Sequence, residues 1–357
     1  LTLTGGNAGQ GGGVLTEAGS DTTLTGMVLA NNTATKQIDG GGGVWNEGEM
    51  SILTSTIRAN SATGPLGRGG GIWNDGGTLT VDSSTISDNS VVNSGGGIFN
   101  NHGTLAVDAS TISGNSAGNA AGGILSDTDL SSPTTTITHS TISGNSADRG
   151  GGVFNFDGLT VIEHSTLTLN TANTGSGVWS LGNSYTQTDV RSSIIAGNSD
   201  DDDVHTDGSS DFVSLGYNLI GGGNESGAFT ASGDQTGVTD PMLGVLADNG
   251  GLTQTHALVP GSPAINAGDP AFVSPPNADQ RGEPRVQLGR IDVGAFEFDT
   301  ATIPPGGLVV DTTDDVFNGD YSMSDLSLRE ALELANANAG MQTVSFDSAL
   351  TGMINLG

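Results

Sequence analysis

The densest set of groups that could do chemistry is an acidic segment at residues 199–211, SDDDDVHTDGSSD. Carboxylate oxygens are the ligands that Ca²⁺ prefers, so this segment is a candidate calcium site and Ca²⁺ the candidate cofactor. The spacing matches neither an EF-hand loop nor a calcium-binding nonapeptide, and a solvated charge run is the competing interpretation. The candidate ligands are Asp200, Asp201, Asp202, Asp203, Asp207 and Asp211.

Side chains suited to acid–base catalysis are scattered. The only lysine is Lys36, the five histidines are dispersed, and the absence of cysteine excludes thiolate chemistry. The arginines of the repeats show no shared position; they are Arg58, Arg68, Arg149 and Arg191. Hydrolysis of a polysaccharide would need a pair of carboxylates in one groove. We therefore predict no catalytic residues and a protein that is not an enzyme, with a polysaccharide lyase or hydrolase as the last alternative.

Large apolar side chains recur directly after a Val or Ile that follows a glycine run. Because neighbouring residues of a strand point to opposite faces, this series is expected to face outward. Such a row could stack and shield a corner, or it could offer a platform to sugar rings or to a neighbouring protein. The candidate stripe is Trp45, Trp73, Phe99, Phe154 and Trp179, with Leu15 and Leu125 at the same position in two further units.

All of these side chains belong to a unit that recurs seven times between residues 11 and 198, with GGGIWNDGGTLTVDSSTISDNS at 69–90 as a clear copy. A period of 25–30 residues indicates stacked units. Residues 78–82 alternate polar and apolar, as a half-buried strand does, and 84–87 are expected to form a second strand. Glycine runs supply corners, where a positive φ suits glycine alone. We predict an all-β, right-handed parallel β-helix (solenoid) of at least seven coils, with three short strands per coil.

An asparagine follows the second apolar residue of each unit by three positions. That apolar residue, Val28 in the first unit and Ile57 in the next, is expected to point inward. Stacked amides can hydrogen-bond from one coil to the next, so we predict a structural ladder rather than a catalytic role. The ladder comprises Asn31, Asn60, Asn89, Asn115, Asn145, Asn170 and Asn198.

The charge balance restricts the partners. The chain has 9 Lys and Arg against 39 Asp and Glu, a net charge of −30. Nucleic acid needs a basic face, so we expect no nucleic-acid partner. No apolar run approaches the length of a membrane span, and we predict none. The excess of carboxylates favours bound divalent cations or, equally, simple solubility outside the cell.

Residues 212–298 carry the strings TDPMLGVLADNGG, THALVPGSPAINAGD, ADQRGEPR and GRIDVGAFEF. They resemble the choice-of-anchor Q region that follows parallel β-helix repeats in bacterial surface proteins. The resemblance implies a secreted or cell-surface protein and names no chemistry. We expect its motifs to be packing and turn elements, with an ion pair between Arg281 or Arg290 and Asp279 or Asp292.

The C-terminal residues begin a new pattern. SLREALELANAN predicts one short amphipathic helix, with Ser327 and Glu330 as a capping box and Gly340 at its end. This segment resembles the CSLREA domain, which normally stands at the start of such β-helices, although Leu326 replaces the cysteine of that name. Its candidate assembly residues are Leu326, Leu328, Leu332, Val344, Phe346 and Ile354.

The predicted order is β-helix coils at 1–198, a choice-of-anchor Q-like extension at 199–298, a linker at 299–307 and a CSLREA-like capping segment at 308–357. A starting cap thus lies after the coils, and the first coil shows none. We expect copies of the chain to meet head to tail, as a tandem array or as a polymer. The predicted function is an extracellular structural module or subunit of a surface fibre or adhesin-like stalk. The alternative is a carbohydrate-binding surface module that uses the aromatic stripe, with a glycan as its partner.

Overall fold

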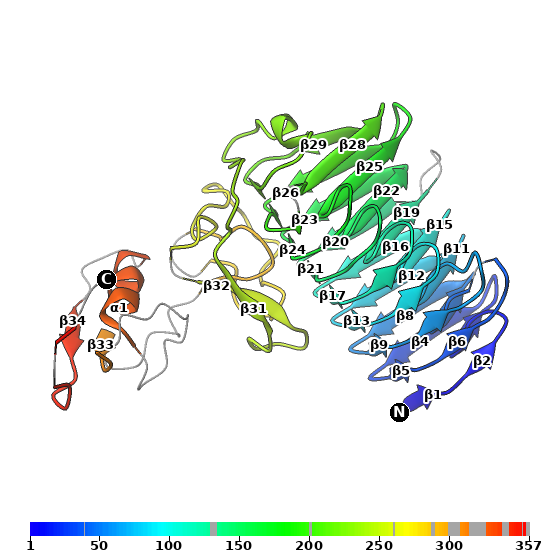
Figure 1. Cartoon of the computed structure of the whole chain (residues 1–357), viewed down its shortest axis with the longest axis horizontal. Coiled ribbons are helices and arrows are strands. Elements are labelled where there is room, and N and C mark those ends of the chain that lie inside the picture. The colour runs from blue at the N-terminus through cyan, green and yellow to red at the C-terminus, as the bar shows by residue number, and fades with distance from the viewer. Residues whose placement is uncertain are drawn as a thin grey trace.

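The computed structural model describes residues 1–38, 40–128, 134–199, 202–259, 261–286, 290–298, 308–313, 326–337, 343–351 and 353–354. They form a parallel β-solenoid of about eight coils of about 28 residues, which confirms the predicted fold class. The coils stack in chain order from the blue N-terminal coil to the green one that holds β28 and β29 (Figure 1). Within the described residues, no helix is long and apolar enough to cross a membrane.

Each coil contributes strands to up to four parallel sheets, here called A to D, rather than to the three expected. Sheet A holds β1 (Thr2–Thr4), β5 (Val28–Ala30), β9 (Thr56–Arg58), β13 (Thr85–Ser87), β17 (Thr111–Ser113), β21 (Thr141–Ser143), β24 (Thr166–Thr168), β27 (Ile194–Ile195) and β30 (Leu219–Ile220). Sheet B holds β2 (Asn7–Ala8), β6 (Thr33–Ala34), β10 (Ser61–Ala62), β14 (Ser90–Val91) and β18 (Ser116–Ala117). Sheet C holds β3 (Val14–Thr16), β7 (Val44–Asn46), β11 (Ile72–Asp75), β15 (Ile98–Asn101), β19 (Ile124–Asp127), β22 (Val153–Asp157), β25 (Val178–Gly182) and β28 (Val204–Gly208). Sheet D holds β4 (Asp21–Thr25), β8 (Glu49–Leu53), β12 (Thr78–Asp82), β16 (Thr104–Asp108), β20 (Thr134–Thr138), β23 (Leu159–Glu163), β26 (Gln187–Arg191) and β29 (Asp211–Ser214).

The apolar core is a column inside the coils. Ile72 pairs with Val44 below it and with Ile98 above it, and all three are fully buried. Because parallel strands pair in register and alternate side chains point inward, each inward position repeats once per coil. The glycine corner lets successive coils approach closely. A Cβ on Gly96 would lie 2.4 Å from the carbonyl oxygen of Gly122.

The first rung of the asparagine ladder differs from the prediction. Leu29, rather than Val28, is fully buried in the core column. Asn32, rather than Asn31, donates its amide to Oδ1 of Asn60 at 3.0 Å. Asn31 takes the corner position with a φ of 55°. The sequence is ambiguous here because two apolar residues and two asparagines stand side by side, and only the strand register chooses between them.

From Asn60 to Asn198 the ladder is continuous. Each Oδ1 accepts the backbone N–H and the Nδ2 of the asparagine one coil earlier, at 2.9–3.0 Å. A second ladder is made by serine hydroxyls at another corner, and a third by Asn46, Asn74 and Asn100. The serine ladder, which ends on Asn218, comprises Ser55, Ser84, Ser110, Ser140, Ser165 and Ser193. These polar corners satisfy buried backbone groups that the tight turns leave unpaired.

The segment 202–298 has two parts. Its first part continues the column as an eighth coil through β28, β29 and β30, followed by the short 3₁₀ helix η2 (Ser226–Ala228). Its second part folds back beside the column and includes the antiparallel pair β31 (Leu243–Ala247) and β32 (Thr255–Leu258), shown in yellow-green in Figure 1. Hydrogen bonds from Thr253 and Gln280 reach the backbone carbonyls of Ala109 and Ser110, at the corner between β16 of sheet D and β17 of sheet A.

The C-terminal residues form a small β-α-β unit. The strands β33 (Leu308–Val310) and β34 (Val344–Phe346) pair in parallel, and α1 (Leu328–Ala337) packs against both. Leu326 and Ala331 are buried there, with Leu328 partly buried beside them. The expected helix is present; Gly340 and the linker 299–307 lie outside the described residues.

Candidate functional sites

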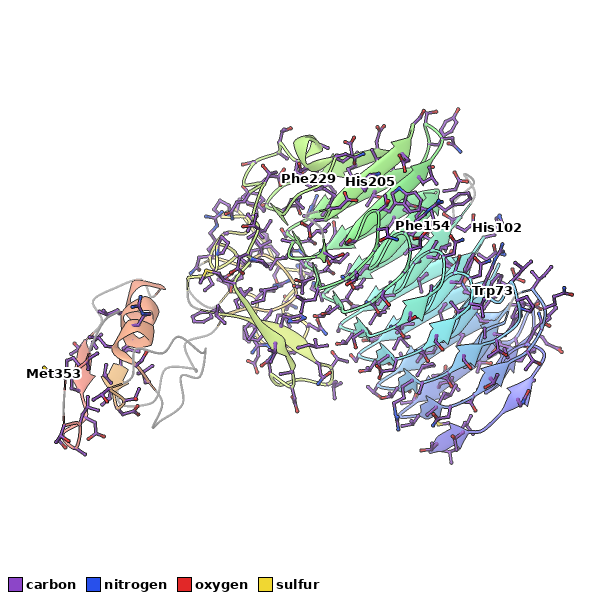
Figure 2. All side chains as sticks on the ribbon, viewed as in Figure 1. Trp73, His102, Phe154, His205, Phe229 and Met353 are labelled. Atoms are coloured by element: carbon purple, nitrogen blue, oxygen red, sulfur yellow. The ribbon has the colours of Figure 1, made fainter. Side chains whose placement is uncertain are left out.

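The aromatic row on sheet C points away from the coil interior, as expected, but it is covered. Its five rings are only 2–5% exposed. Trp73 stacks on Trp45 with ring centroids 5.4 Å apart and on Phe99 at 4.5 Å, while Phe154 stacks on Trp179 at 4.3 Å (Figure 2 labels Trp73 and Phe154). The ring faces therefore contact each other, and the row leaves little aromatic surface exposed to a ligand.

Cations cover this row from the glycine corner. Lys36 lies over the Trp45 ring at 5.5 Å, Arg68 over Phe99 at 5.5 Å and Arg149 over Trp179 at 5.6 Å. The four repeat arginines share no single position, as expected, because Arg58 ends β9 on sheet A and Arg191 ends β26 on sheet D; Arg68 and Arg149 alone are equivalent. A ladder of single β-bridges joins Arg68 through two intermediate residues to Arg149. Variable loop lengths hide this equivalence in the sequence.

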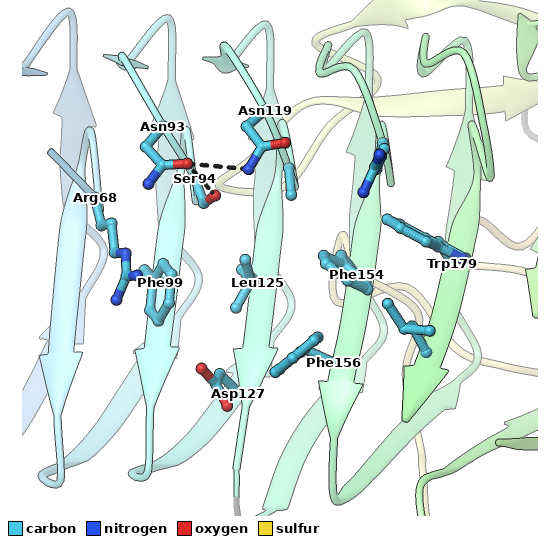
Figure 3. Close-up of a pocket in the computed structure, with 13 residues that line it drawn as sticks. Arg68, Asn93, Ser94, Phe99, Asn119, Leu125, Asp127, Phe154, Phe156 and Trp179 are labelled. Atoms are coloured by element: carbon cyan, nitrogen blue, oxygen red, sulfur yellow. Dashed lines mark hydrogen bonds between the residues drawn. The ribbon is translucent and has the colours of Figure 1, made fainter. Parts of the chain in front are cut away.

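A groove of about 260 Å³ opens beside the row where Leu125 replaces an aromatic ring. Phe156 lies along its lower side, and Asn93 and Asn119 along its upper side (Figure 3); Leu181 also lines it. Phe156 is 39% exposed, whereas the stacked rings are not. Phe156 was not among the residues predicted from the sequence. The sequence does mark it, because Phe156 follows Val153 by three positions, where an earlier coil has Asp75 three positions after Ile72.

The six acidic candidates for calcium do not gather at one point in the described residues. Asp203 is buried and turns inward, where its Oδ1 accepts the Asn198 backbone N–H at 3.0 Å and extends the ladder. Asp202 and Asp207 lie 3.1 and 3.6 Å from the His205 ring nitrogens. Asp211 begins β29 and is exposed, and Asp200 and Asp201 lie outside the described residues. No described trio of His, Asp or Glu is placed to hold a metal ion, so calcium binding stays a prediction.

The ADQRGEPR and GRIDVGAFEF motifs build a buried ionic cluster. Arg281 pairs with Asp279 at 2.8 Å, and Arg285 pairs with Glu297 at 3.3 Å. Burial and the nearby Asp292 together raise the pKa of Glu297 to about 9, although Arg285 opposes the shift. Burial likewise raises the pKa of Asp292 to about 6. Arg290, the other expected partner, instead donates to backbone carbonyls.

These buried groups are closed to a substrate and hold the back-folded segment onto sheet A. Gln280 accepts a hydrogen bond from the Thr141 hydroxyl at 2.6 Å, and the Ala295 N–H donates to the Thr166 hydroxyl at 3.1 Å. Arg285 donates to Gly294 O at 2.8 Å. The motifs therefore act as packing and docking elements, because every one of these bonds joins the segment to itself or to the column.

Two histidines stack at a neighbouring corner. His139 and His164 have ring centroids 5.4 Å apart, and His139 Nδ1 lies 2.9 Å from Asp108. Burial, together with the positive charges of Arg285, His139 and Arg191, lowers the pKa of His164 to about 2. His164 lines a polar cavity of about 300 Å³. A histidine with so low a pKa is a poor proton acceptor at neutral pH.

The two ends of the chain differ from the closed column between them. In the first coil, β1, β2, β3 and β4 each pair with a neighbour on one side only. The inward residues Leu3, Val14, Leu24 and Met27 are only partly buried, whereas those of later coils are fully buried. In the C-terminal unit, Leu332 and Phe346 are 45% and 53% exposed. Of the other assembly candidates there, Val344 and Ile354 are partly buried.

No protein-family model matches this chain, and neither a curated protein nor a solved structure shows significant similarity to it. The fold established for the chain is thus the parallel β-solenoid alone.

Proposed function

We propose that the chain is a structural module of an extracellular fibre or adhesin-like stalk, in which the C-terminal unit of one copy covers the first coil of the next. The observation that carries this proposal is the small β-α-β unit that follows the column, in which Leu332 and Phe346 are 45% and 53% exposed. An apolar end with free strand edges is a template for strand addition, and natural solenoids cover such ends.

The C-terminal unit is a suitable cover. Among the residues that the structure describes, its parallel sheet has two strands and no further partner at either edge, and Phe346 on β34 and Met353 after it are 53% and 84% exposed. A two-stranded sheet is marginal alone and gains from further pairing. The CSLREA-like sequence of this unit supports the same role. The choice-of-anchor Q resemblance and the net charge of −30 support a surface or secreted location.

Hydrogen exchange of the β1–β4 amides tests the proposal. We expect protection to rise with protein concentration if separate copies join, and to appear at any concentration in a genetic tandem of two copies if the array is covalent. Removing residues 299–357 should abolish both effects. Amides that stay equally exposed in all of these samples would contradict head-to-tail stacking.

Two matched variants sharpen the test. Leu15 is 47% exposed at the open end, and Val92 is 52% exposed at the middle of the column. Leu15→Glu places a carboxylate in the proposed contact, where its desolvation is unfavourable. It should abolish association seen by electron microscopy, while Val92→Glu should leave association intact.

A further inference from the structure

The groove beside Leu125 lies where the aromatic row of sheet C is interrupted. Five of the seven outward positions after the glycine corner hold closely packed aromatic rings, whereas Leu125, although buried, lacks the ring that fills the row in adjacent coils. Phe99 and Phe154, one coil to either side, form no ring contact with each other. The missing ring contributes to the hollow of about 260 Å³.

Two apolar side chains lie at this groove beside a polar row. On sheet C, Asp75, Asn101, Asp127 and Asp157 pair with one another from coil to coil, and Phe156 and Leu181 line the groove next to them. Phe156 stands at a β-bulge, because Ser126 pairs with Asn155 whereas Asp127 pairs with Asp157. Bulges re-aim side chains and are frequent beside binding sites.

The bulge gives Phe156 an orientation that the stacked rings lack. Its ring is inclined at 74° to that of Phe154, with centroids 5.8 Å apart, and it is 39% exposed. Figure 3 shows it below Leu125 and beside Asp127. A partly exposed ring set across the row presents surface on which another ring can stack.

The rim supplies both donors and acceptors. Asn119 Nδ2 donates to Asn93 Oδ1 at 3.1 Å, which leaves the second amide N–H of Asn119 and its oxygen to other partners. Arg149 lies over the Trp179 ring and forms a long, exposed ion pair with Asp148 at 3.7 Å, and Asp127 also lines the groove. Sugar hydroxyls, which donate and accept at once, match such a mixed rim.

We propose that this groove binds one neutral pyranose residue of a polysaccharide, with Phe156 as the stacking platform. The volume lies just below the roughly 300 Å³ at which drug-sized pockets begin, which suits a single sugar ring. The net charge of −30 repels polyanions at long range, and the rim itself holds both signs of charge. This site is independent of head-to-tail assembly, so either proposal can fail alone.

Saturation-transfer NMR and calorimetry on the full chain test the proposal with hexasaccharides of glucose, mannose and galacturonic acid. A neutral sugar should bind. Phe156→Ala should weaken binding by about tenfold through loss of stacking. Leu125→Phe should weaken it as strongly, by filling the hollow with the ring that adjacent coils carry, while leaving the melting temperature unchanged or higher. The control Tyr185→Ala removes a 70% exposed aromatic ring that does not line the groove, and it should bind as the unaltered chain does.

Three outcomes would overturn the proposal. The first is that none of the three sugars binds. The second is that the sugar binds but neither groove variant weakens it. The third is that only the galacturonate binds, with affinity that collapses as salt is raised, since that result would assign the groove to anions.

Discussion

Replacing Asn115 with alanine tests the asparagine ladder at the middle of the column. This side chain is fully buried and makes four hydrogen bonds. Its Oδ1 accepts the backbone N–H and Nδ2 of Asn89 at 3.0 and 2.9 Å. Its Nδ2 donates to the carbonyl of Ile86 and to Oδ1 of Asn145, both at 2.9 Å.

Each of these bonds contributes about 1 kcal/mol net, so their loss lowers the free energy of unfolding by about 4 kcal/mol. Their partners lie in the buried corner, where water cannot replace the amide. The full loss of about 4 kcal/mol is therefore expected. The backbone N–H of Asn115 still donates to Asn145, so the coil itself should keep its register.

Urea unfolding followed by tryptophan fluorescence measures the loss, because all three tryptophans lie in the column. The matched control is Asn101→Ala, which removes one partly buried hydrogen bond, to Asp75 at 2.7 Å, and should cost about 1 kcal/mol. A loss for Asn115→Ala no greater than for the control, at an unchanged denaturant slope, would refute the reasoning.

Three further predictions concern other parts of the molecule. His164 is buried and its pKa is lowered to about 2. It therefore contributes stability above its unfolded pKa of 6.5, and this stability is lost as the pH falls below that value. His164→Asn should flatten the pH dependence of the free energy of unfolding by up to about 1.4 kcal/mol per pH unit between pH 6.5 and 4. Arg285→Met removes the hydrogen bonds of a buried guanidinium to Gly294 O and to Glu297 and should speed hydrogen exchange of the covered sheet A amides by destabilising the docked segment by about 3 kcal/mol. Gly96→Ala forces a Cβ against a backbone carbonyl and should lower the midpoint of thermal unfolding by several degrees, about 2 kcal/mol, whereas Gly9→Ala enters open space.

Each of these variants has its own control. His102 is exposed and shares the left-handed backbone of His164, with a φ of 52° against 49°, so His102→Asn should leave the pH dependence unchanged. Arg290→Met removes a cation that bonds only backbone carbonyls among the described hydrogen bonds, and exchange on sheet A should stay slow. A pH profile unaltered in His164→Asn, or equal exchange in the two arginine variants, would contradict the corresponding assignment.

The repeat was readable because its physics is local and periodic. Val44, Ile72 and Ile98 follow glycine runs at regular spacing, and the structure stacks them as expected. The same reasoning failed at Asn31, where two adjacent residues of the same kind fit the pattern and only pairing with the next coil selects Asn32. It also missed the serine ladder, although a serine stands before the threonine and isoleucine of most units.

Sequence alone determined that the chain stacks coils, which kinds of residue fill the column and where its corners turn. Each of these follows from two repeats in the sequence: side chains alternate between two faces within a strand, and the same position returns once per coil. Only the tertiary structure decided that the aromatic row is closed by its own stacking, that Phe156 is exposed by a bulge, and that Arg285 and Glu297 meet inside a segment folded back on sheet A. Those features depend on contacts between residues far apart in the chain, whose positions are set by loop lengths and packing. Such contacts leave no period in the sequence.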